Sequence, residues 1–515
     1  MEYDFDTSPE LQVPGDWNTQ DPTLLYYEGT IWYRRLFDVD EPEEGRAFLH
    51  FGAVNHTARI FLDGEELATH VGGFGPFAVE VTGRLAPGRH TLIVQVNNRR
   101  EPNRIPAMRA DWWNFGGITR SVDLVRLPNT FLRTAWLTMA PDGSIVGGIE
   151  IDGETDMPCA VTLPELNLAV PAIGGRVEID AATAARIPRW NPGRPILHRV
   201  RWQCGDDIID DRVGFRTVRI DGTRLLVNDE EVFLNGISLH GEGPSGGRRA
   251  HGPTDAATLF DWVEDLGANF VRLAHYQHDE HMLAEADRRG LLAWTELPVY
   301  WGIAFDDPAV LANALDQTDE LVARDRSRAS IILWSVANET LPGDERLAFL
   351  TALVDRVRAL DSTRLTTAAL LTIPSADPEV HVTDPLGAVV DVVAINQYLG
   401  WYYGERDDIP STRFTTEVAK PIIFSELGAG AKAGRHGGED EIWTEEFQAA
   451  VYQAQLAMIA DHEGCVGLSP WILKDFRTPL RVLPGIQDGY NRKGLVSEEG
   501  ERKLAFDVVR QFYQR

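Results

Sequence analysis

Two glutamates stand at the ends of short apolar runs that indicate strands. Glu426 closes the run 421–426, and Glu339 closes the run 331–339. A carboxylate at the tip of a buried strand is costly to desolvate and contributes nothing to packing, so we expect it to serve a function. Two such carboxylates at the tips of parallel strands suit an acid and a nucleophile, which hydrolysis of a glycosidic bond requires.

The arrangement of these two carboxylates depends on their strands, because 426 − 339 = 87 residues separate them. We expect Glu339 on the fourth strand and Glu426 on the seventh strand of a closed eight-stranded barrel, on roughly opposite sides of its mouth. A separation of about 5–5.5 Å would favour a retaining double displacement, and about 6.5–9.5 Å would favour inversion. One carboxyl group must be protonated and the other ionised. Each glutamate taken alone is equally compatible with a helix N-cap or a surface loop.

Neighbouring polar side chains would complete such a site. Asn338 precedes Glu339, where its amide can bond a sugar hydroxyl, and Tyr398 can donate a hydrogen bond to the nucleophile. Asn396 and Trp471 are expected to end the sixth and eighth strands. Loops that follow the strands build the active sites of (β/α)8 barrels, so these groups should meet at one mouth.

The elements that must position these residues change in character near residue 215. Earlier runs such as 31–37, 58–62 and 90–96 are short and closely spaced, and Asp63-Gly64 is a hairpin signal. They predict a jelly-roll-like β-sandwich over 1–128 and an immunoglobulin-like β-sandwich over 129–217. Residues 218–515 alternate strands with helices, which predicts a (β/α)8 TIM barrel. Its expected strands are 231–239, 270–273, 291–296, 331–336, 365–369, 391–395, 422–426 and 466–471.

Composition excludes several classes of function. The chain has 515 residues, 43% of them hydrophobic and 25% charged, which is typical of a globular protein of two to four domains. Its formal net charge of −29 disfavours binding to nucleic acid and to anionic membranes. No apolar run approaches the roughly 18–20 residues of a membrane span.

The three cysteines, Cys159, Cys204 and Cys465, are far apart and odd in number. They show neither a disulfide framework nor zinc-ligand spacing, which fits a reducing compartment. The acidic N-terminal segment has no apolar stretch typical of a signal peptide. The sequence therefore predicts a cytoplasmic protein without a disulfide.

Several motifs resemble glycoside hydrolase family 2. They are Asn338-Glu339 after a Trp-Ser strand, the block 396–402, and Ser425-Glu426-Leu427-Gly428. The segments 214–218, 234–236, 32–35 and 114–118 also fit, so the resemblance covers nearly the whole chain. It implies a sugar-binding sandwich, Glu339 as acid/base, Glu426 as nucleophile, retention of configuration and no metal or organic cofactor.

One motif bears on the substrate. Asn491-Arg492-Lys493-Gly494 resembles the Asn-x-Lys pair by which the family's β-glucuronidases hold the substrate carboxylate. Lys493 would supply a cation and Asn491 an amide; a solvated basic turn is the alternative. The family's glucuronidases have an arginine four residues before this asparagine, where this chain has Gln487. Arg477 or Arg481 is a candidate replacement, and the departure leaves β-galacturonide open beside β-glucuronide.

The resemblance also implies further substrate contacts. Asp111 would reach from the first sandwich into the barrel mouth, and His240 would contact substrate after the first strand. From their places in the chain, Trp471 at the end of the eighth strand and Tyr402 after Trp401 are expected to line the same pocket. A turn carboxylate, a structural histidine and a buried aromatic are the respective alternatives. His275 is given a hydrogen-bonding role near the sugar.

Two other kinds of site are weaker interpretations. His275, His278 and His281 are three residues apart, a spacing that a metal could use. Gly243-Pro244-Ser245-Gly246-Gly247 spells G-x-S-x-G, but a nucleophile elbow needs a sharp strand-to-helix turn, and this is a glycine-rich loop.

We expect an exo-acting β-glycosidase whose partner is a carbohydrate substrate, a β-uronide or a related β-glycoside, and whose chains form a homo-oligomer. Its rivals are a β-galactosidase, a β-mannosidase, and a carbohydrate-binding protein with an inactive barrel.

Overall fold

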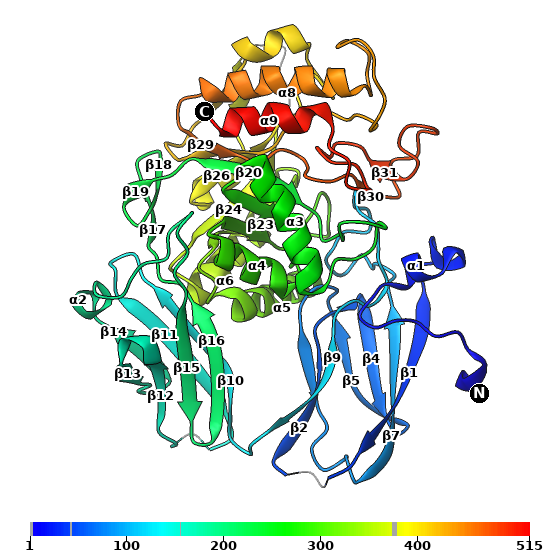
Figure 1. Ribbon diagram of the computed structural model, residues 1–515, viewed down its shortest axis with the longest axis vertical. Helices are drawn as coiled ribbons and strands as arrows, with labels where there is room; N and C mark the ends of the chain where they lie inside the picture. Colours follow the sequence, from blue (N-terminus) through cyan, green and yellow to red (C-terminus); the bar gives the residue numbers. More distant parts are fainter. Residues whose placement is uncertain (1–3, 42–43, 155, 373–378) are drawn as a thin grey trace.

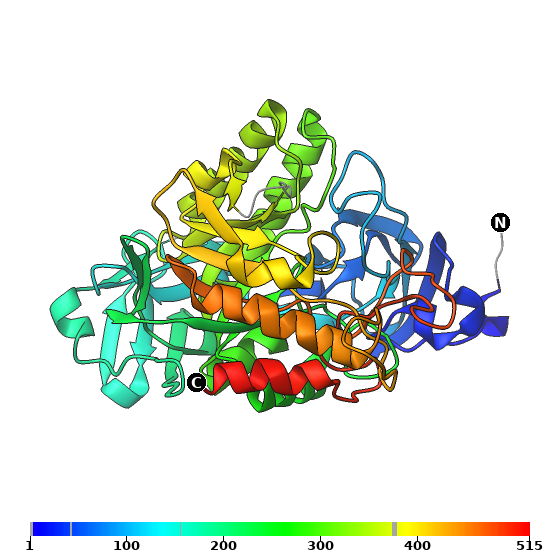
Figure 2. The same ribbon diagram turned by 90° about the horizontal axis from the view of Figure 1, so that it is seen from above.

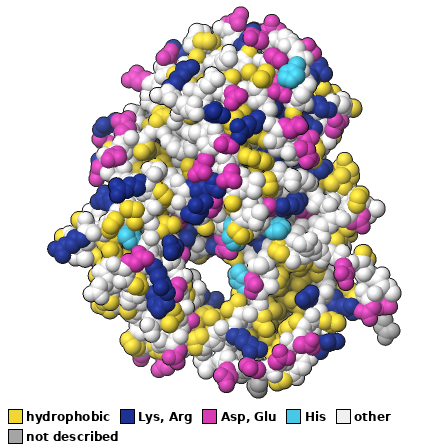
Figure 3. Space-filling model, in the orientation of Figure 1, with side chains coloured by type: hydrophobic (Ala, Val, Ile, Leu, Met, Phe, Trp, Pro, Cys, Tyr) yellow, Lys and Arg dark blue, Asp and Glu magenta, His cyan; other side chains and the backbone are white. Residues whose placement is uncertain are grey.

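The computed structural model describes residues 4–41, 44–154, 156–372 and 379–515. Two β-sandwiches stand beside each other below a barrel, and the space-filling view has an opening between them (Figures 1 and 3). Acidic and basic side chains are interspersed on the face that Figure 3 shows. Seen from above, the barrel lies between the two sandwiches (Figure 2). The predicted fold class, β-sandwiches followed by a TIM barrel, is confirmed.

The first sandwich packs two antiparallel sheets, β1-β7-β4-β5 and β6-β2-β9. In β7 every second side chain, including Leu92, Val94 and Val96, is buried between the sheets, as the two-residue period of a strand requires. Its strands are β1 (Thr30–Val39), β2 (Arg46–Phe51), β3 (Val54–Asn55), β4 (Thr57–Leu62), β5 (Glu65–Val71), β6 (Phe77–Glu80), β7 (Gly88–Asn97), β8 (Gly117–Ile118) and β9 (Val122–Leu127). The short helices η1 (Phe5–Thr7), α1 (Trp17–Gln20) and η2 (Pro22–Leu24) precede them.

The second sandwich packs β10-β11-β14 on β13-β12-β15-β16 around Leu137, Val161, Val200 and Trp202. Its strands are β10 (Phe131–Met139), β11 (Ile145–Asp152), β12 (Cys159–Leu163), β13 (Leu168–Pro171), β14 (Arg176–Ile179), β15 (His198–Cys204) and β16 (Asp207–Val213). The helices η3 (Pro164–Leu166) and α2 (Ala181–Ala184) lie between its strands. A small sheet of β17 (Val218–Asp221), β18 (Arg224–Val227) and β19 (Glu230–Glu231) leads to the barrel.

The cysteines of the second sandwich correct one prediction. Cys159 and Cys204 face each other across β12 and β15 and form a disulfide, so the expectation of no disulfide is wrong. Cys465 is free and partly buried. Residues 45 positions apart became neighbours through strand pairing, which spacing alone does not reveal.

The barrel closes in the order β20-β21-β22-β23-β24-β26-β28-β29. Its strands are β20 (Leu234–Leu239), β21 (Phe270–Leu273), β22 (Leu292–Glu296), β23 (Ile331–Asn338), β24 (Leu365–Leu371), β26 (Val392–Asn396), β28 (Ile422–Glu426) and β29 (Cys465–Leu468). Every residue of β22, β23, β26 and β28 is buried, as expected of parallel strands covered on both faces. The eighth strand ends at Leu468, so the prediction that Trp471 ends it is wrong, and Trp471 lies in the following loop.

Helices cover the outside of the barrel: α3 (Gly252–Leu266), α4 (Glu280–Arg289), α5 (Pro308–Asp325), α6 (Asp344–Leu360), α7 (Leu386–Val389), η4 (Arg406–Ser411), α8 (Glu445–Ala460) and α9 (Leu504–Tyr513). Thr444 caps α8 by accepting a hydrogen bond from the Phe447 amide. Helices α8 and α9 lie side by side (Figures 1 and 2), and the Leu504 amide donates to Glu445. Two small sheets, β25 (Glu379–Val382) with β27 (Arg413–Thr416) and β30 (Phe476–Arg477) with β31 (Tyr490–Asn491), belong to the loops. No helix among the described residues is long and apolar enough to cross a membrane.

The first sandwich is fixed to the mouth of the barrel. Its loop 98–116 carries Asp111 and Trp112, and the Trp112 ring contacts the rings of His240, His275 and Tyr300. Arg120 donates to the Gln277 carbonyl oxygen at 2.9 Å. Residues of this sandwich therefore take part in the barrel's site.

Candidate active site

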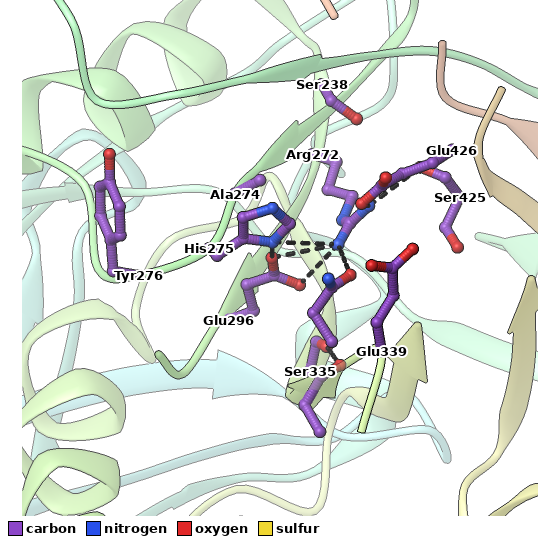
Figure 4. Close-up of polar contacts among 12 residues, drawn as sticks. Ser238, Arg272, Ala274, His275, Tyr276, Glu296, Ser335, Glu339, Ser425 and Glu426 are labelled. Atoms are coloured by element: carbon purple, nitrogen blue, oxygen red, sulfur yellow. Dashed lines mark hydrogen bonds and ion pairs between the residues drawn. The ribbon is translucent and has the colours of Figure 1, made fainter. Parts of the chain in front are cut away.

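Arg272 is the centre of the polar network at the barrel mouth. It lies on β21, is fully buried, and donates to Glu426 Oε1 at 2.9 Å and to Asn338 Oδ1 at 2.7 Å. Figure 4 shows its guanidinium between Glu296 and Glu426, with the Glu339 carboxylate beside it. The sequence reasoning missed this residue. Its signal was a charged side chain in the otherwise apolar strand Phe270-Val271-Arg272-Leu273, because a buried arginine requires anionic partners.

Glu426 ends β28 and is almost completely buried. The Tyr398 hydroxyl donates to its Oε2 at 2.6 Å, so each carboxylate oxygen has a charged or strong donor. Burial raises the pKa of Glu426, and the nearby charge of Glu339 acts in the same direction. Arg272, His275 and the Tyr398 hydrogen bond oppose this and stabilise the ionised form that a nucleophile needs.

Glu339 directly follows β23 and is only partly buried, so solvent or a substrate can reach it. Its Oε1 accepts a hydrogen bond from Asn396 at 3.0 Å, and its Oε2 accepts one from the Trp301 indole at 2.9 Å. Its φ of 50° lies in the left-handed region. A non-glycine residue held there stores backbone strain, which often occurs at functional sites.

Asn338 has one buried amide without a partner. Its Oδ1 accepts hydrogen bonds from Arg272 and from Asn396, whereas its Nδ2 has no hydrogen-bond partner among the described residues. A buried unsatisfied donor is costly unless a ligand completes it. The amide is therefore available to a sugar hydroxyl.

His275 and Glu296 hold the other side of Arg272. The His275 ring nitrogen Nδ1 lies 2.6 Å from Glu296 Oε1, and Trp294 Nε1 donates to Glu296 Oε2 at 2.9 Å. Burial alone would raise the pKa of Glu296, but the charges of Arg272 and His275 lower it to about 2. Glu296 is therefore an ionised carboxylate that balances the charge of Arg272.

A cationic cluster lies next to this network. Lys493 is almost completely buried, donates to the Tyr402 hydroxyl at 2.6 Å, and lies 4.9 Å from the ring centroid of Tyr398. Burial would raise the pKa of Tyr402, but the charges of Lys493 and Arg481 lower it below its usual value. Lys493 is therefore not part of a solvated basic turn, which was the alternative interpretation.

Asp111 connects this cluster to the first sandwich. Its Oδ2 accepts from Arg481 at 2.6 Å and from Asn491 Nδ2 at 3.2 Å, and its Oδ1 accepts from Thr478. Asp111 is buried, so it is not the solvated turn carboxylate of the alternative interpretation.

Arg477 and Arg481, the two candidates to replace the family's arginine that is missing at Gln487, have different partners. Arg481 joins the cluster through Asp111 and interacts with Tyr402. Arg477 donates to the Tyr490 hydroxyl and lies over the Trp113 ring, with its guanidinium carbon 5.6 Å from the ring centroid. Arg481 is therefore the arginine beside Asn491 and Lys493.

Aromatic rings pack around His240 and Trp471 at the barrel mouth. The Trp471 ring is 5.2 Å from the His240 centroid and stacks on His275 at 4.8 Å. His240 Nδ1 lies 3.2 Å from the Tyr276 hydroxyl, and its Nε2 has no partner among the described residues. His240, directly after β20, and Trp471, in the loop after β29, are both buried at the mouth.

Two weaker interpretations find no support. His275, His278 and His281 bond separate partners, namely Glu296, the Ala274 carbonyl oxygen and Asp279. No group of three or more metal-ligating side chains exists within residues 4–41, 44–154, 156–372 and 379–515. The segment 243–247 lies inside the long loop between β20, which ends at Leu239, and α3, which begins at Gly252, so Ser245 does not stand on a sharp strand-to-helix turn.

Comparisons with known proteins show the family of this chain. Family models described as "Glycosyl hydrolases family 2, TIM barrel domain" and "Glycosyl hydrolases family 2, sugar binding domain" match residues 218–515 and 1–128. A β-glucuronidase of Paenibacillus borealis is 27% identical over 98% of this chain and 91% of its own length.

Solved structures are similar over nearly the full length. A β-galacturonidase of Eisenbergiella tayi bound to galacturonate is 25% identical, with a TM-score of 0.86 over 98% of this chain and 92% of that chain. The Faecalibacterium prausnitzii β-glucuronidase is 25% identical, with a TM-score of 0.87 over 99% of this chain and 93% of that chain. This chain is a glycoside hydrolase of family 2, similar to the family's β-glucuronidases.

Proposed function

We propose that this enzyme is an exo-acting, retaining β-uronidase that removes a terminal β-linked uronic acid, with β-D-glucuronide as the first candidate. One observation carries the proposal: the buried cation of Lys493 lies 4.9 Å from the ring of Tyr398, whose hydroxyl bonds Glu426. A cation one aromatic ring away from the nucleophile suits a sugar whose carboxylate is attached to the ring being attacked.

The charges of the cluster support an anionic ligand. Lys493 and Arg481 bring two cations, and Asp111 balances one of them. The chain has a net charge of −29, so a positive local potential must be built from particular residues. The lowered pKa of Tyr402 reflects that potential.

In the proposed reaction Glu339 donates its proton to the glycosidic oxygen while Glu426 attacks the anomeric carbon and forms a glycosyl ester. The leaving group departs, and Glu339 then removes a proton from a water that attacks the same carbon. The ester bond to Glu426 breaks, and the sugar is released with its original configuration. Asn338 bonds a hydroxyl of the attacked ring, and Tyr398 and Arg272 hold Glu426 in place.

β-Galacturonide is the second candidate. Gln487 stands where the family's glucuronidases have an arginine, and Arg481 reaches the cluster from a different position. Glucuronate and galacturonate differ in the configuration at C4. The different position of Arg481 could therefore change which of the two sugars the site binds better. The similar Eisenbergiella tayi enzyme, a β-galacturonidase, supports this candidate.

A panel of 4-nitrophenyl β-glycosides tests the proposal. We expect turnover of the glucuronide or the galacturonide at least 100-fold above the galactoside and the mannoside, as expected for a site built to bind a polar group that the competitor lacks. Lys493→Ala should lower kcat/KM for uronides far more than for neutral glycosides. Lys420→Ala is the matched control, because Lys420 binds backbone carbonyl oxygens at the opposite end of the barrel. Equal losses on both substrate classes would reject the carboxylate site.

Two further predictions concern the whole protein. We propose a cytoplasmic location and a homo-oligomer that uses the sandwich surfaces. The disulfide Cys159–Cys204 is more typical of an oxidising compartment, so cell fractionation with detection of the protein in each fraction tests the location. Protein found mainly in the exported fraction would reject the cytoplasmic proposal. Light scattering would give the number of chains per particle, and a monomer would reject the oligomer.

A further inference from the structure

Trp301 lies against the acid/base carboxylate. Its indole donates to Glu339 Oε2, and its amide donates to the Asn338 carbonyl oxygen at 3.0 Å, which joins the loop after β22 to the end of β23. Its φ of 54° is in the left-handed region, where a large side chain is strained. Trp301 is partly exposed, so part of its surface is open to a ligand.

Arg109 lies over the face of this tryptophan. Its guanidinium carbon is 5.9 Å from the centroid of the Trp301 ring, at the outer limit of a cation–π contact. Arg109 is exposed, and no ion pair of its side chain occurs among the described residues. Arg109 belongs to loop 98–116, two residues before Asp111. This loop therefore contacts both the cationic cluster, through Asp111, and Trp301 beside Glu339, through Arg109.

The role of Glu339 as proton donor determines which part of a substrate lies next to Arg109 and Trp301. The acid protonates the glycosidic oxygen, which joins the terminal sugar to its leaving group. Groups on the solvent side of Glu339 therefore face the leaving group, whereas Tyr398, Lys493 and Arg481 face the terminal sugar. Met108, next to Arg109 in the sequence, and Leu341, two residues after Glu339, are 58% and 66% exposed.

We propose that Trp301 and Arg109 form a leaving-group subsite for an acidic sugar residue. The ring of that residue packs on the indole, and its carboxylate or sulfate pairs with Arg109. The substrate would then be an acidic oligosaccharide in which the terminal uronic acid is followed by a second anionic sugar. This inference rests on the proposed glycosidase function, but it does not require the terminal sugar to be a uronic acid.

The test uses two aryl β-glycosides of the terminal sugar that the enzyme turns over best. One leaving group carries a ring carboxylate, and the other carries the methyl ester of the same carboxylate. We expect Arg109→Ala to lower the carboxylate-to-ester ratio of kcat/KM about tenfold, mainly through KM, and Arg109→Lys to restore much of that ratio. Added salt should lower the same ratio in the wild type.

Arg126→Ala is the matched control, because Arg126 is an exposed arginine on β9 and its loss changes the net charge equally. An unchanged ratio in Arg109→Ala, or an equal change in Arg126→Ala, would overturn the subsite. The two proposals fail separately: if only neutral glycosides are hydrolysed, the uronidase proposal fails, and the ratio measured on a neutral glycoside still decides the role of Arg109.

Discussion

The hydroxyl of Tyr398 donates a hydrogen bond of 2.6 Å to Glu426, and this phenol stays protonated because burial raises its pKa well above the usual value. The bond stabilises the ionised form of Glu426. Lys493 lies 4.9 Å from the centre of the same ring. Tyr398 therefore contacts the side chain proposed as nucleophile on one side and the residue proposed to bind the substrate carboxylate on the other.

Removing this hydroxyl should change the pH dependence of the enzyme. In Tyr398→Phe the pKa of Glu426 rises, because a hydrogen bond to its ionised form is lost. The nucleophile must be ionised, so the acid limb of the kcat/KM profile should move to higher pH, and kcat should fall roughly 10–100-fold. Tyr513→Phe is the control, since that buried hydroxyl donates to the Gly236 carbonyl oxygen on β20. An unmoved acid limb would show that Tyr398 does not set the ionisation of Glu426.

Replacing Glu339 should make the rate depend on the leaving group. Glu339→Ala removes the proposed proton donor, and general acids contribute typically about 10²–10⁴-fold. We expect losses in that range for poor leaving groups and much smaller losses for 2,4-dinitrophenyl glycosides, which depart without a proton. Azide should restore turnover of the activated substrates and give a β-glycosyl azide. A uniform loss across leaving groups would exclude Glu339 as the acid.

Arg272 should matter for stability as well as for activity. In Arg272→Met the carboxylates of Glu296 and Glu426 lose their shared cation, and breaking a buried ion pair costs roughly 3–5 kcal/mol. Chemical denaturation should show this loss. The double variant Arg272→Met/Glu296→Gln should recover part of the stability and none of the activity. A double variant no more stable than the single one would contradict the charge balance.

Glu242 should make stability fall as pH rises. Burial raises its pKa to about 7, above the ordinary value of 4.5, although the charge of Lys474 opposes this. Its Oε2 has no hydrogen-bond partner among the described residues, and the Lys474 ammonium lies 3.9 Å from it. Between pH 4.5 and 7 the unfolded chain has released this proton while the folded protein keeps it, so this group's contribution to stability decreases.

Glu242→Gln removes that dependence. The free energy of unfolding of the variant, relative to wild type, should therefore increase from pH 5 to pH 8 by an amount on the order of 3 kcal/mol. Glu10→Gln, at an exposed position, should show no such trend. A constant difference between Glu242→Gln and wild type would mean that Glu242 is ionised at pH 5.

The barrel strands were predictable from the sequence because each contains a short, largely apolar run. Phe270–Leu273 and Ile422–Glu426 have the predicted bounds. Trp471 was misplaced because the apolar run 466–471 continues past the last strand pairing at Leu468. An apolar run shows that residues are buried. It does not separate buried strand residues from buried loop residues, so it does not give the strand end.

The hydrogen bond from Tyr398 to Glu426 was predicted from the sequence, but the partners of Arg272 and Trp301 were not. Arg272 and Trp301 gain their meaning from Glu426 and Glu339, which are 154 and 38 residues away. Arg272 gives one local signal, a charge within an apolar strand, and Trp301 gives none; the partners of both residues come together only in the closed barrel. The sequence likewise did not show which of Arg477 and Arg481 joins the cationic cluster. The structure shows that Arg481 does, because it bonds Asp111 of the first sandwich.

The most direct test of the account is to trap the covalent intermediate on Glu426. A 2-deoxy-2-fluoro-β-glycosyl fluoride of the preferred sugar should inactivate the enzyme with one sugar per chain, because the fluorine slows hydrolysis of the glycosyl ester. Mass spectrometry of the digested protein should place the sugar on the peptide that contains Glu426. A sugar on Glu339 or Glu296, or turnover of a substrate with inversion and without any adduct, would contradict the proposed mechanism.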